Sequence, residues 1–401
     1  MPEPSPVIVA AAPAAGSQRY HALDSVRAVM MLLGIYLHAV VAYAPIGGWP
    51  YKQLELTNAL NFTVILIHVF RMPLFYVMAG FFAALLYERR GFRLAVENRV
   101  WRILIPFVVG WCIIFPLVML LVEPMKFGWA YTLESFASGD FLLYAHPLHL
   151  WFLEYLLVLY GLALIVGIGI RALVPSGLCN ACNRLFRSAV GAWWGPLLFA
   201  VPSFAALLPM RYAGFDDPPS FVPQPRIVIA YAIPFVFGWL LYLNTDLIGT
   251  LRRRCWPYAL VAVVPIAFYL RLVPLPADLQ PLPFAVRCAI HSLALWLLIF
   301  AIVGLFERYL GGYSRTMRYI CDSSYFLYLA HMPVLLVFQV LLLQVDIAPL
   351  WKIPIALAAT VAVLLVMYRY GVRPTVIGAV LNGRRYPIRT NAALATAAVQ
   401  P

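Results

Sequence analysis

Charged side chains are scarce in this sequence. Asp, Glu, Lys and Arg make up 11% of the 401 residues, whereas 64% of the residues are apolar. Soluble globular proteins have roughly 25% charged and 45–50% apolar residues, so the composition excludes an ordinary soluble enzyme. A disordered chain and a coiled coil need many more polar residues and are excluded as well. We expect most of the chain to lie in a lipid bilayer, with its many aromatic residues available for the interfaces.

Cysteine motifs and nucleotide-binding motifs are lacking too. The six cysteines are scattered, several inside apolar runs, and indicate no disulfide framework. Cys179 and Cys182 form one CxxC pair, but no second pair or histidine follows at the spacing of a zinc site. The sequence contains no P-loop, dinucleotide fingerprint, GxSxG elbow or HExxH helix. We therefore expect no metal site and no permanently bound cofactor.

Long apolar runs, in contrast, occupy most of the chain. A helix of about 20 apolar residues crosses the roughly 30 Å of hydrocarbon in a bilayer. The sequence predicts ten such helices, at 26–45, 62–87, 103–122, 149–170, 193–210, 227–245, 256–273, 284–306, 322–345 and 351–370. The fifth and seventh runs are short and contain proline. The predicted fold is an all-α, polytopic transmembrane helix bundle of about ten spans over residues 19–375, between a disordered N-terminal tail (1–18) and a C-terminal tail (376–401).

Basic residues outnumber acidic residues, with 29 Lys and Arg against 16 Asp and Glu and a net charge of +13. In a soluble protein such a surplus suggests a nucleic-acid partner. In a membrane protein it records topology, because cytoplasmic loops collect Lys and Arg. With ten spans and a cytoplasmic N-terminus, most of the basic residues fall on the cytoplasmic side. We therefore expect both termini to be cytoplasmic and no nucleic acid to bind.

The first predicted span carries ionisable residues, which are costly inside a membrane and mark functional sites. Arg27 lies at its cytoplasmic end, and His38 follows eleven residues later, on the same helix face and about 16 Å deeper. Asp24, one turn before Arg27, is placed to pair with it. The alternative interpretation is that Arg27 only anchors the helix and that His38 is a hydrogen-bonded packing residue.

The second and fourth spans hold further polar groups near their outer ends. His68 and Arg71 lie in the second span, and Arg71 is too deep to reach the outer surface easily. A permanent charge at that depth requires an anionic partner or a wet cavity, unless the span starts later and Arg71 is interfacial. The fourth span begins with His149, Trp151 and Glu154. Glu154 is predicted to be a counter-ion for Arg71, a structural residue or a proton acceptor.

The ninth span has a polar stripe. Its members recur every three residues and are Asp322, Tyr325, Tyr328 and His331. Such a stripe is typical of a lined pocket, although hydrogen bonding between helices is the alternative. Histidine is the usual general base for a hydroxyl group, because its pKa lies near neutrality. We expect His331 and His38 to line one pocket inside the membrane.

An arginine-rich segment precedes the third span. Arg93, Arg99 and Arg102 belong to it, and Arg99 and Arg102 are spaced to face one way on a helix. Arginine donates paired hydrogen bonds to phosphate, and donors of the coenzyme A type carry several phosphates at one end. Anchoring by positive charge at the cytoplasmic interface is the alternative explanation. The segment predicts a donor site at the inner face, below His38.

Five phrases of the sequence resemble the acyltransferase-3 family of integral membrane acyltransferases. They are LDSVRAVMMLLGIYLHA, FRMPLFYVMAGFF, RVWRILIPF, HLWFLEYLLVLY and SSYFLYLAHMPV, in the family's order. Within the family the chain is most similar to the glucan biosynthesis protein C group, the succinyltransferases of osmoregulated periplasmic glucans. The resemblance implies a multi-pass protein of the bacterial inner membrane. It also implies that His38 is the family's essential first-span histidine, that Arg27 is the basic member of that motif, and that Arg99 and Arg102 are the pair associated with coenzyme A.

The predicted function is therefore O-acyl transfer from a cytosolic acyl-CoA, with succinyl-CoA expected, to a hydroxyl group of a periplasmic glucan. The predicted catalytic residues are His38, His331, Glu154 and Arg71. The predicted donor site consists of Arg27, Arg93, Arg99 and Arg102, and the predicted acceptor site consists of His68, His149, Trp151, Asp322, Tyr325 and Tyr328. The alternative function is a transporter of a glycan or an anionic solute, with Arg71 and His331 along its path.

Overall fold

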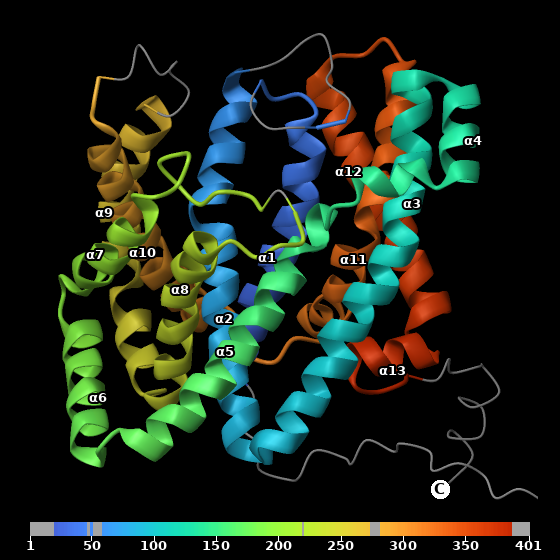
Figure 1. The fold of residues 1–401 in the computed structure, drawn as a ribbon. Helices are drawn as coiled ribbons and strands as arrows, with labels where there is room; N and C mark the ends of the chain where they lie inside the picture. Colours follow the sequence, from blue (N-terminus) through green and yellow to red (C-terminus); the bar gives the residue numbers. More distant parts are fainter. Residues whose placement is uncertain (1–19, 46–48, 51–57, 219, 273–280, 387–401) are drawn as a thin grey trace, which may run out of the picture.

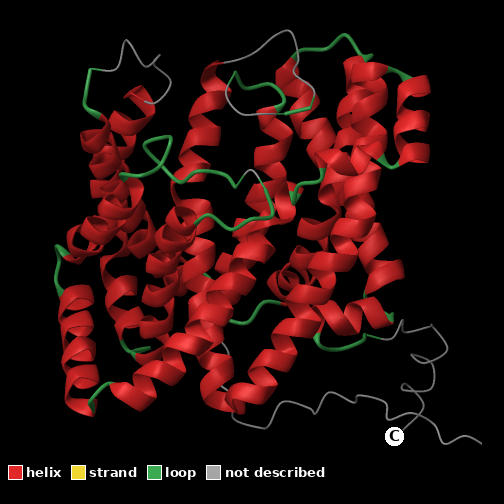
Figure 2. Ribbon diagram, viewed as in Figure 1, coloured by secondary structure: helices red, strands yellow, loops and turns green. Residues whose placement is uncertain are grey.

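The computed structural model describes residues 20–45, 49–50, 58–218, 220–272 and 281–386. Every regular element in these residues is a helix, as Figures 1 and 2 show. The α-helices are α1 (His21–Val41), α2 (Asn58–Arg99), α3 (Ile105–Phe127), α4 (Trp129–Ser138), α5 (Trp151–Leu173), α6 (Ser176–Gly191), α7 (Gly195–Leu207), α8 (Pro225–Leu243), α9 (Leu247–Leu272), α10 (Phe284–Tyr309), α11 (Arg315–Leu343), α12 (Pro349–Met367) and α13 (Val376–Asn382). Short helical turns are η1 (Val100–Leu104), η2 (Asp140–Tyr144), η3 (Leu148–Leu150) and η5 (Tyr368–Val372). The predicted all-α bundle is confirmed, and the predicted tail 1–18 lies outside the described residues.

Successive helices run back and forth through the bundle (Figure 1). In the described part of the chain, eight helical stretches are long and apolar enough to span a bilayer, and the pair α6–α7, bent by 115°, adds a ninth. One stretch, Ala59–Phe127, has 69 residues and would reach roughly 100 Å as a single helix, far beyond the hydrocarbon thickness. It breaks at Gly91, where φ is 74°, and α2 and α3 run in opposite directions. Counted as two crossings, it brings the total to the ten predicted spans.

The two weakest predicted spans differ in detail from the sequence prediction. The fifth corresponds to α7, whose 13 residues are too short to cross the bilayer alone and follow the polar helix α6 at a sharp bend. The seventh begins earlier than predicted, at Leu247, and α9 continues through Pro257 and Pro265. Proline is tolerated there because neighbouring helices and local adjustments satisfy the freed backbone groups.

Helices α2 and α8 pack with their backbones in contact. A side chain at Gly80 of α2 would collide with the backbone carbonyl of Phe235 in α8, and one at Gly238 of α8 would collide with that of Val77. In lipid, where apolar surface gives no driving force for association, small residues allow this close packing. The contact fixes α2, the helix that carries Arg71.

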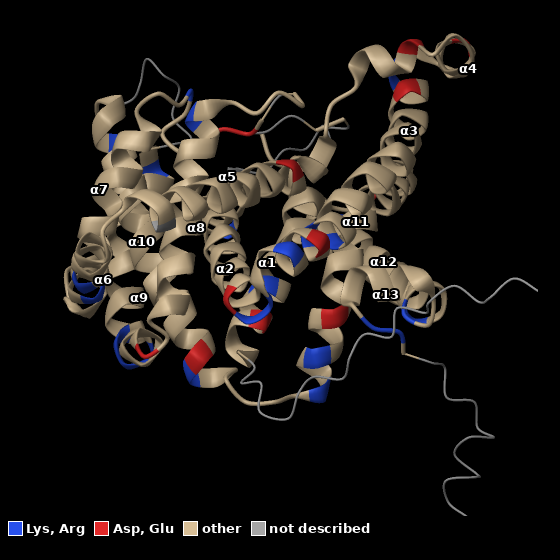
Figure 3. Ribbon diagram, turned by 60° about the horizontal axis from the view of Figure 1, so that its bottom comes forward, with Lys and Arg blue, Asp and Glu red and all other residues tan. Residues whose placement is uncertain are grey.

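The outside of the bundle is apolar between two polar ends. Large side chains such as Ile165 of α5 and Leu260 of α9 are exposed, as expected for residues that face lipid. Figure 3 brings one end of the bundle forward and shows Lys and Arg side by side there, including those of α6 and α9. By the positive-inside rule this is the cytoplasmic end, and the orientation stays a prediction. We call it the inner end below.

Candidate active site

Three histidines from distant parts of the sequence meet in the outer half of the bundle. The ring centroids of His38 in α1 and His331 in α11 are 5.2 Å apart, and that of His149 in η3 is 4.6 Å from His331 and 6.3 Å from His38. We call them the histidine cluster. In the described residues no trio of His, Cys, Asp or Glu side chains, this cluster included, has an arrangement that could hold a metal ion. The predicted meeting of His38 and His331 is thus present, and His149, predicted as an acceptor-site residue, joins them.

Backbone contacts orient two of these rings. Nδ1 of His331 lies 2.7 Å from the carbonyl oxygen of Tyr328, and Nε2 of His149 lies 3.2 Å from that of Leu329. A carbonyl oxygen only accepts hydrogen bonds, so each of these ring nitrogens carries the proton. The neutral rings then have a lone pair at Nε2 of His331 and at Nδ1 of His149. Both of these nitrogens are buried without a hydrogen-bond partner among the described residues, as is Nδ1 of His38. The cluster therefore holds nitrogen atoms that are free to accept a proton.

The backbone at the start of the fourth span is strained next to His149. Leu148 has φ of 51° and is the one non-glycine residue with positive φ in the described chain. Such a conformation costs on the order of 1–3 kcal/mol and persists where the surrounding structure enforces it. Tyr328 contributes to that enforcement, because its hydroxyl group donates a 2.8 Å hydrogen bond to the carbonyl oxygen of His149. The strain therefore accompanies the placement of the His149 ring against His331.

Two residues that the sequence analysis did not single out complete the outer side of the cluster. The indole ring of Trp49 stacks on His38, with ring centroids 5.2 Å apart. Its Nε1 donates to Oε1 of Gln339, whose Nε2 donates to the carbonyl oxygen of His38. The sequence features that could have pointed to them are a Trp in a predicted outer loop and a polar Gln inside a predicted span. Their contacts fix the outer end of α1 around the histidine.

Arg71 of α2 lies beside the same face of α1. Its guanidinium group is close to Gly34, one helical turn before His38, and a Cβ atom at Gly34 would lie 2.5 Å from Nη1. Its Nη2 is 3.3 Å from the Met72 sulfur, and its Nε is buried without a partner among the described residues. The carboxylate that interacts with it electrostatically belongs to Asp217, in the loop between α7 and α8. That acidic residue also interacts with His68, which was predicted as an acceptor-site residue.

Glu154 and Trp151 lie at the start of α5. Glu154 forms no ion pair with Arg71 among the described residues, and its Oε2 is buried without a partner there. The Trp151 ring packs near Tyr155 and Tyr231. The expected counter-ion role of Glu154 is therefore wrong, because Arg71 lies against α1 and its acidic neighbour is in the loop between α7 and α8.

The polar stripe of α11 connects the histidine cluster with the inner end. His331 belongs to the cluster, and Tyr328 hydrogen-bonds to the backbone of His149 in it. The hydroxyl group of Tyr325, one turn below, donates a 2.8 Å hydrogen bond to the carbonyl oxygen of Arg102. Asp322, predicted to line an acceptor pocket, instead pairs with Arg318 at 2.9 Å and accepts a 2.7 Å hydrogen bond from Tyr386. Asp322 thus ties the C-terminal segment to α11 at the inner end.

Arginines gather at the inner end of this stripe. Arg27 pairs with Asp24 at 3.4 Å, and Arg102 interacts electrostatically with both Arg27 and Arg99. The Arg99 guanidinium lies 4.3 Å from the ring centroid of Tyr160. We call Arg27, Arg99 and Arg102 the inner arginine cluster. With one acidic residue beside three guanidinium groups, the cluster favours anions such as phosphate.

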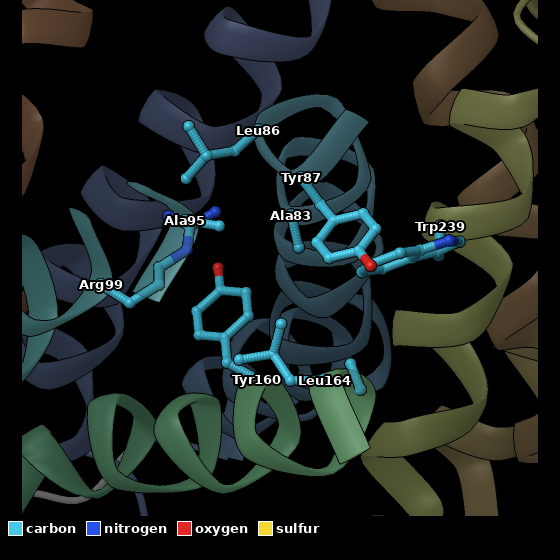
Figure 4. Close-up of a pocket in the computed structure, with 9 residues that line it drawn as sticks. Ala83, Leu86, Tyr87, Ala95, Arg99, Tyr160, Leu164 and Trp239 are labelled. Atoms are coloured by element: carbon cyan, nitrogen blue, oxygen red, sulfur yellow. The ribbon is translucent and has the colours of Figure 1, made fainter. Parts of the chain in front are cut away.

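A small pocket of about 20 Å³, open to the surface, adjoins Arg99 and is drawn in Figure 4. Arg99 and Tyr160, in contact with each other, lie on one side of it, and Tyr87 and Trp239 lie on the other. Arg93, predicted to bind the donor, is exposed on the segment before Arg99 and does not line the cavity. Arg99 therefore borders a small open pocket, which the sequence alone did not predict.

Comparison with known proteins identifies the family of the chain. The sequence profile of the acyltransferase domain of the acyltransferase-3 family matches residues 20–369. The proteins named glucans biosynthesis protein C from Salmonella gallinarum and Salmonella paratyphi B are each 27% identical to the chain over 338 residues, which cover 80% of this chain and 83% of theirs. No solved structure matches. Because the profile spans the whole helix bundle from α1 to α12, the protein belongs to the acyltransferase-3 family and is a membrane acyltransferase.

Proposed function

We propose that the protein transfers a succinyl group from succinyl-CoA at the inner end of the bundle to a hydroxyl group of a glucan at the outer end. The observation that carries this proposal is the relation between the two clusters. Helix α1 is continuous from His21 to Val41 and has Arg27 of the inner cluster and His38 of the histidine cluster on one face, about 16 Å apart. Acyl-CoA joins its phosphates to its thioester through a long flexible arm of comparable reach.

The inner arginine cluster is the proposed donor site. In this scheme Arg99 and Arg102 bind the phosphates of coenzyme A, with Arg27 nearby, and Arg99 borders a small pocket that is open to the surface. In this scheme the pantetheine arm lies along the polar stripe of α11, from Tyr325, which contacts Arg102, to His331. Acyl-CoA is a co-substrate in this scheme, and the protein needs no permanently bound cofactor.

The histidine cluster is the proposed reaction centre. His38 accepts the proton of the acceptor hydroxyl group while its oxygen attacks the thioester carbonyl carbon. The carbon–sulfur bond then breaks, coenzyme A leaves with a proton on its sulfur, and the acyl ester remains on the acceptor. The rings of His331 and His149 lie next to His38 and add two further nitrogen lone pairs that accept protons in this scheme. Burial of the cluster keeps bulk water away from the thioester, which limits hydrolysis.

The acceptor enters from the opposite side in this scheme. Trp49, stacked on His38 at the outer end of α1, offers the aromatic surface that sugar rings commonly bind. The names of the two Salmonella relatives point to glucan biosynthesis, which supports a glucan as the acceptor. If the protein lies in the bacterial inner membrane with cytoplasmic termini, the inner arginine cluster faces cytosolic acyl-CoA and the outer end faces periplasmic glucan.

Acyl transfer by the purified protein tests this proposal. In detergent, with labelled succinyl-CoA and periplasmic glucan, the wild-type protein is expected to label the glucan and His38→Ala to lose the activity by a factor of at least about 100. His21→Ala is a matched control, since it removes a histidine from the inner end of the same helix. Labelling by His38→Ala at the wild-type rate would contradict the base assignment. An inactive wild-type protein that moves glucan across vesicles would instead indicate a transporter.

A further inference from the structure

Arg71 is a half-buried permanent charge without an ion-pair partner in the described part of the chain. In the described residues it forms no salt bridge, its Nε has no hydrogen-bond partner, and its Nη2 contacts only the weak acceptor sulfur of Met72. A guanidinium group has five donors, and burying them without acceptors is costly. The guanidinium group therefore has N–H donors available for hydrogen bonds to a ligand.

The groups around Arg71 leave its positive charge available to an anionic ligand. Its electrostatic neighbours are Asp217 in the α7–α8 loop and the hydroxyl groups of Tyr328 and Tyr231. Asp217 is exposed, and no hydrogen bond or ion pair joins it to Arg71 in the described residues, so it attracts Arg71 without occupying its donors. An incoming carboxylate accepts two parallel hydrogen bonds from a guanidinium group and supplies the missing counter-charge.

The position of Arg71 sets the size of that anion. Gly34, which the guanidinium group touches, is one helical turn from His38 on α1, a rise of about 6 Å. A group whose carbonyl carbon reacts beside His38 reaches Arg71 only if its second charge is a few bonds away. A short dicarboxylic acyl group meets this condition, whereas acetyl has no second charge and a long fatty acyl chain would place its apolar body there.

We propose that Arg71 binds the distal carboxylate of the acyl group and thereby selects a dicarboxylic monoacyl donor over an uncharged one. This inference rests on the proposed function, and it assigns to Arg71 a role in donor specificity. Gly34 belongs to the same proposed site, because the absence of a side chain there lets the guanidinium group approach α1. The role also explains why the charge is retained at a depth where burial is costly.

The test compares two donors on the same acceptor, labelled succinyl-CoA and labelled acetyl-CoA. For Arg71→Met we expect the ratio of succinyl to acetyl transfer to fall about 10- to 100-fold, the usual worth of charge-assisted hydrogen bonds. Arg71→Lys, which keeps the charge and loses the paired donors, is expected to fall between Arg71→Met and the wild type. Gly34→Ala displaces the guanidinium group and should lower the same ratio while Arg71 is retained.

Other outcomes overturn the inference or separate it from the proposed function. An unchanged ratio with both activities reduced would mean that Arg71 serves the thioester carbonyl or the fold. A second measurement needs no catalysis, namely the thermal stabilisation of the detergent-solubilised protein by each acyl-CoA alone. Succinyl-CoA should stabilise the wild type more than acetyl-CoA, and Arg71→Met should abolish the difference. Equal stabilisation of the wild type refutes the inference, while an inactive wild type with unequal stabilisation refutes only the proposed function.

Discussion

Two tyrosines one turn apart on α11 make the same kind of contact at different places. Tyr325 donates to the carbonyl oxygen of Arg102 and Tyr328 to that of His149, both at 2.8 Å. One bond fixes the backbone of the inner arginine cluster, and the other fixes the strained backbone that presents the His149 ring. The pair therefore allows the two halves of the proposed site to be perturbed by one chemically identical change.

Tyr328→Phe removes the hydrogen bond to His149 and keeps the ring. We expect kcat to fall about 5- to 10-fold, because a net hydrogen bond is worth about 1 kcal/mol and its loss loosens a residue next to His38. The KM for acyl-CoA should change far less, since the arginines are not touched. Steady-state kinetics with labelled donor at saturating glucan measure both quantities.

Tyr325→Phe is the matched change at the donor site. It frees the backbone of Arg102, so the KM for acyl-CoA should rise by a similar factor of about 5 to 10 while kcat changes less. The two variants are thus expected to affect opposite kinetic parameters. If both lowered kcat alone, the division of α11 between a donor site and a reaction centre would be wrong.

The sequence predicted the spatial relation between two candidate residues correctly where both lie on one helix. Arg27 and His38 share a face of α1 by helical periodicity, and the structure has that helix unbroken. The pairing of Arg71 with Glu154 was wrong because it depended on which helices are neighbours, and hydropathy does not contain that information. Trp49 and Gln339 were missed for the same reason, since their value lies in contacts with His38.

At the scale of helices, the contact between α2 and α8 makes a stability prediction. Gly80→Ala places a Cβ atom against the Phe235 carbonyl oxygen, and the helices must separate to admit it. Overpacking of this kind costs about 1–3 kcal/mol, so the melting temperature of the detergent-solubilised protein should fall. A thermal unfolding curve followed by tryptophan fluorescence measures the shift.

A glycine of α5 supplies the control for that change. Nothing in the structure lies within 4 Å of a Cβ atom built at Gly167, which faces open space in the same kind of apolar helix. Gly167→Ala should therefore leave the melting temperature unchanged or raise it slightly, because Ala favours the helix by up to about 1 kcal/mol. Equal losses in both variants would show that the α2–α8 contact is not tighter than the rest of the bundle.

Element boundaries were predictable where apolar runs and turn residues coincide, as for α8 and α10. They were less so where a helix continues past the membrane or changes direction. Helix α2 extends to Arg99 and turns at Gly91, and the short predicted span 193–210 is the second arm of the bent α6–α7 pair. Such features depend on tertiary packing around the break, which a hydropathy profile averages out.

The whole molecule places its two clusters toward opposite ends of one bundle. Helices α1 and α11 pack side by side: α1 contributes a residue to each cluster, and α11 contributes His331 to one and the hydrogen bond of Tyr325 to Arg102 of the other, so the two helices form the shared wall between donor and acceptor. A catalyst built this way lets each substrate approach from its own compartment, and only the acyl group changes sides. That reasoning depends on the orientation of the bundle, which the distribution of Lys and Arg predicts.

Thiol labelling tests the orientation. Cys179 and Cys182 are exposed on α6, at the end predicted to be cytoplasmic, so a membrane-impermeant maleimide should label the protein in inverted vesicles and not in spheroplasts. The double variant Cys179→Ser and Cys182→Ser should lose that signal. Leu143→Cys adds a thiol at an exposed position after α4, toward the opposite end, and should be labelled in spheroplasts. The reverse pattern would place the inner arginine cluster outside the cell, away from acyl-CoA, and the direction of acyl transfer proposed for this protein would then be wrong.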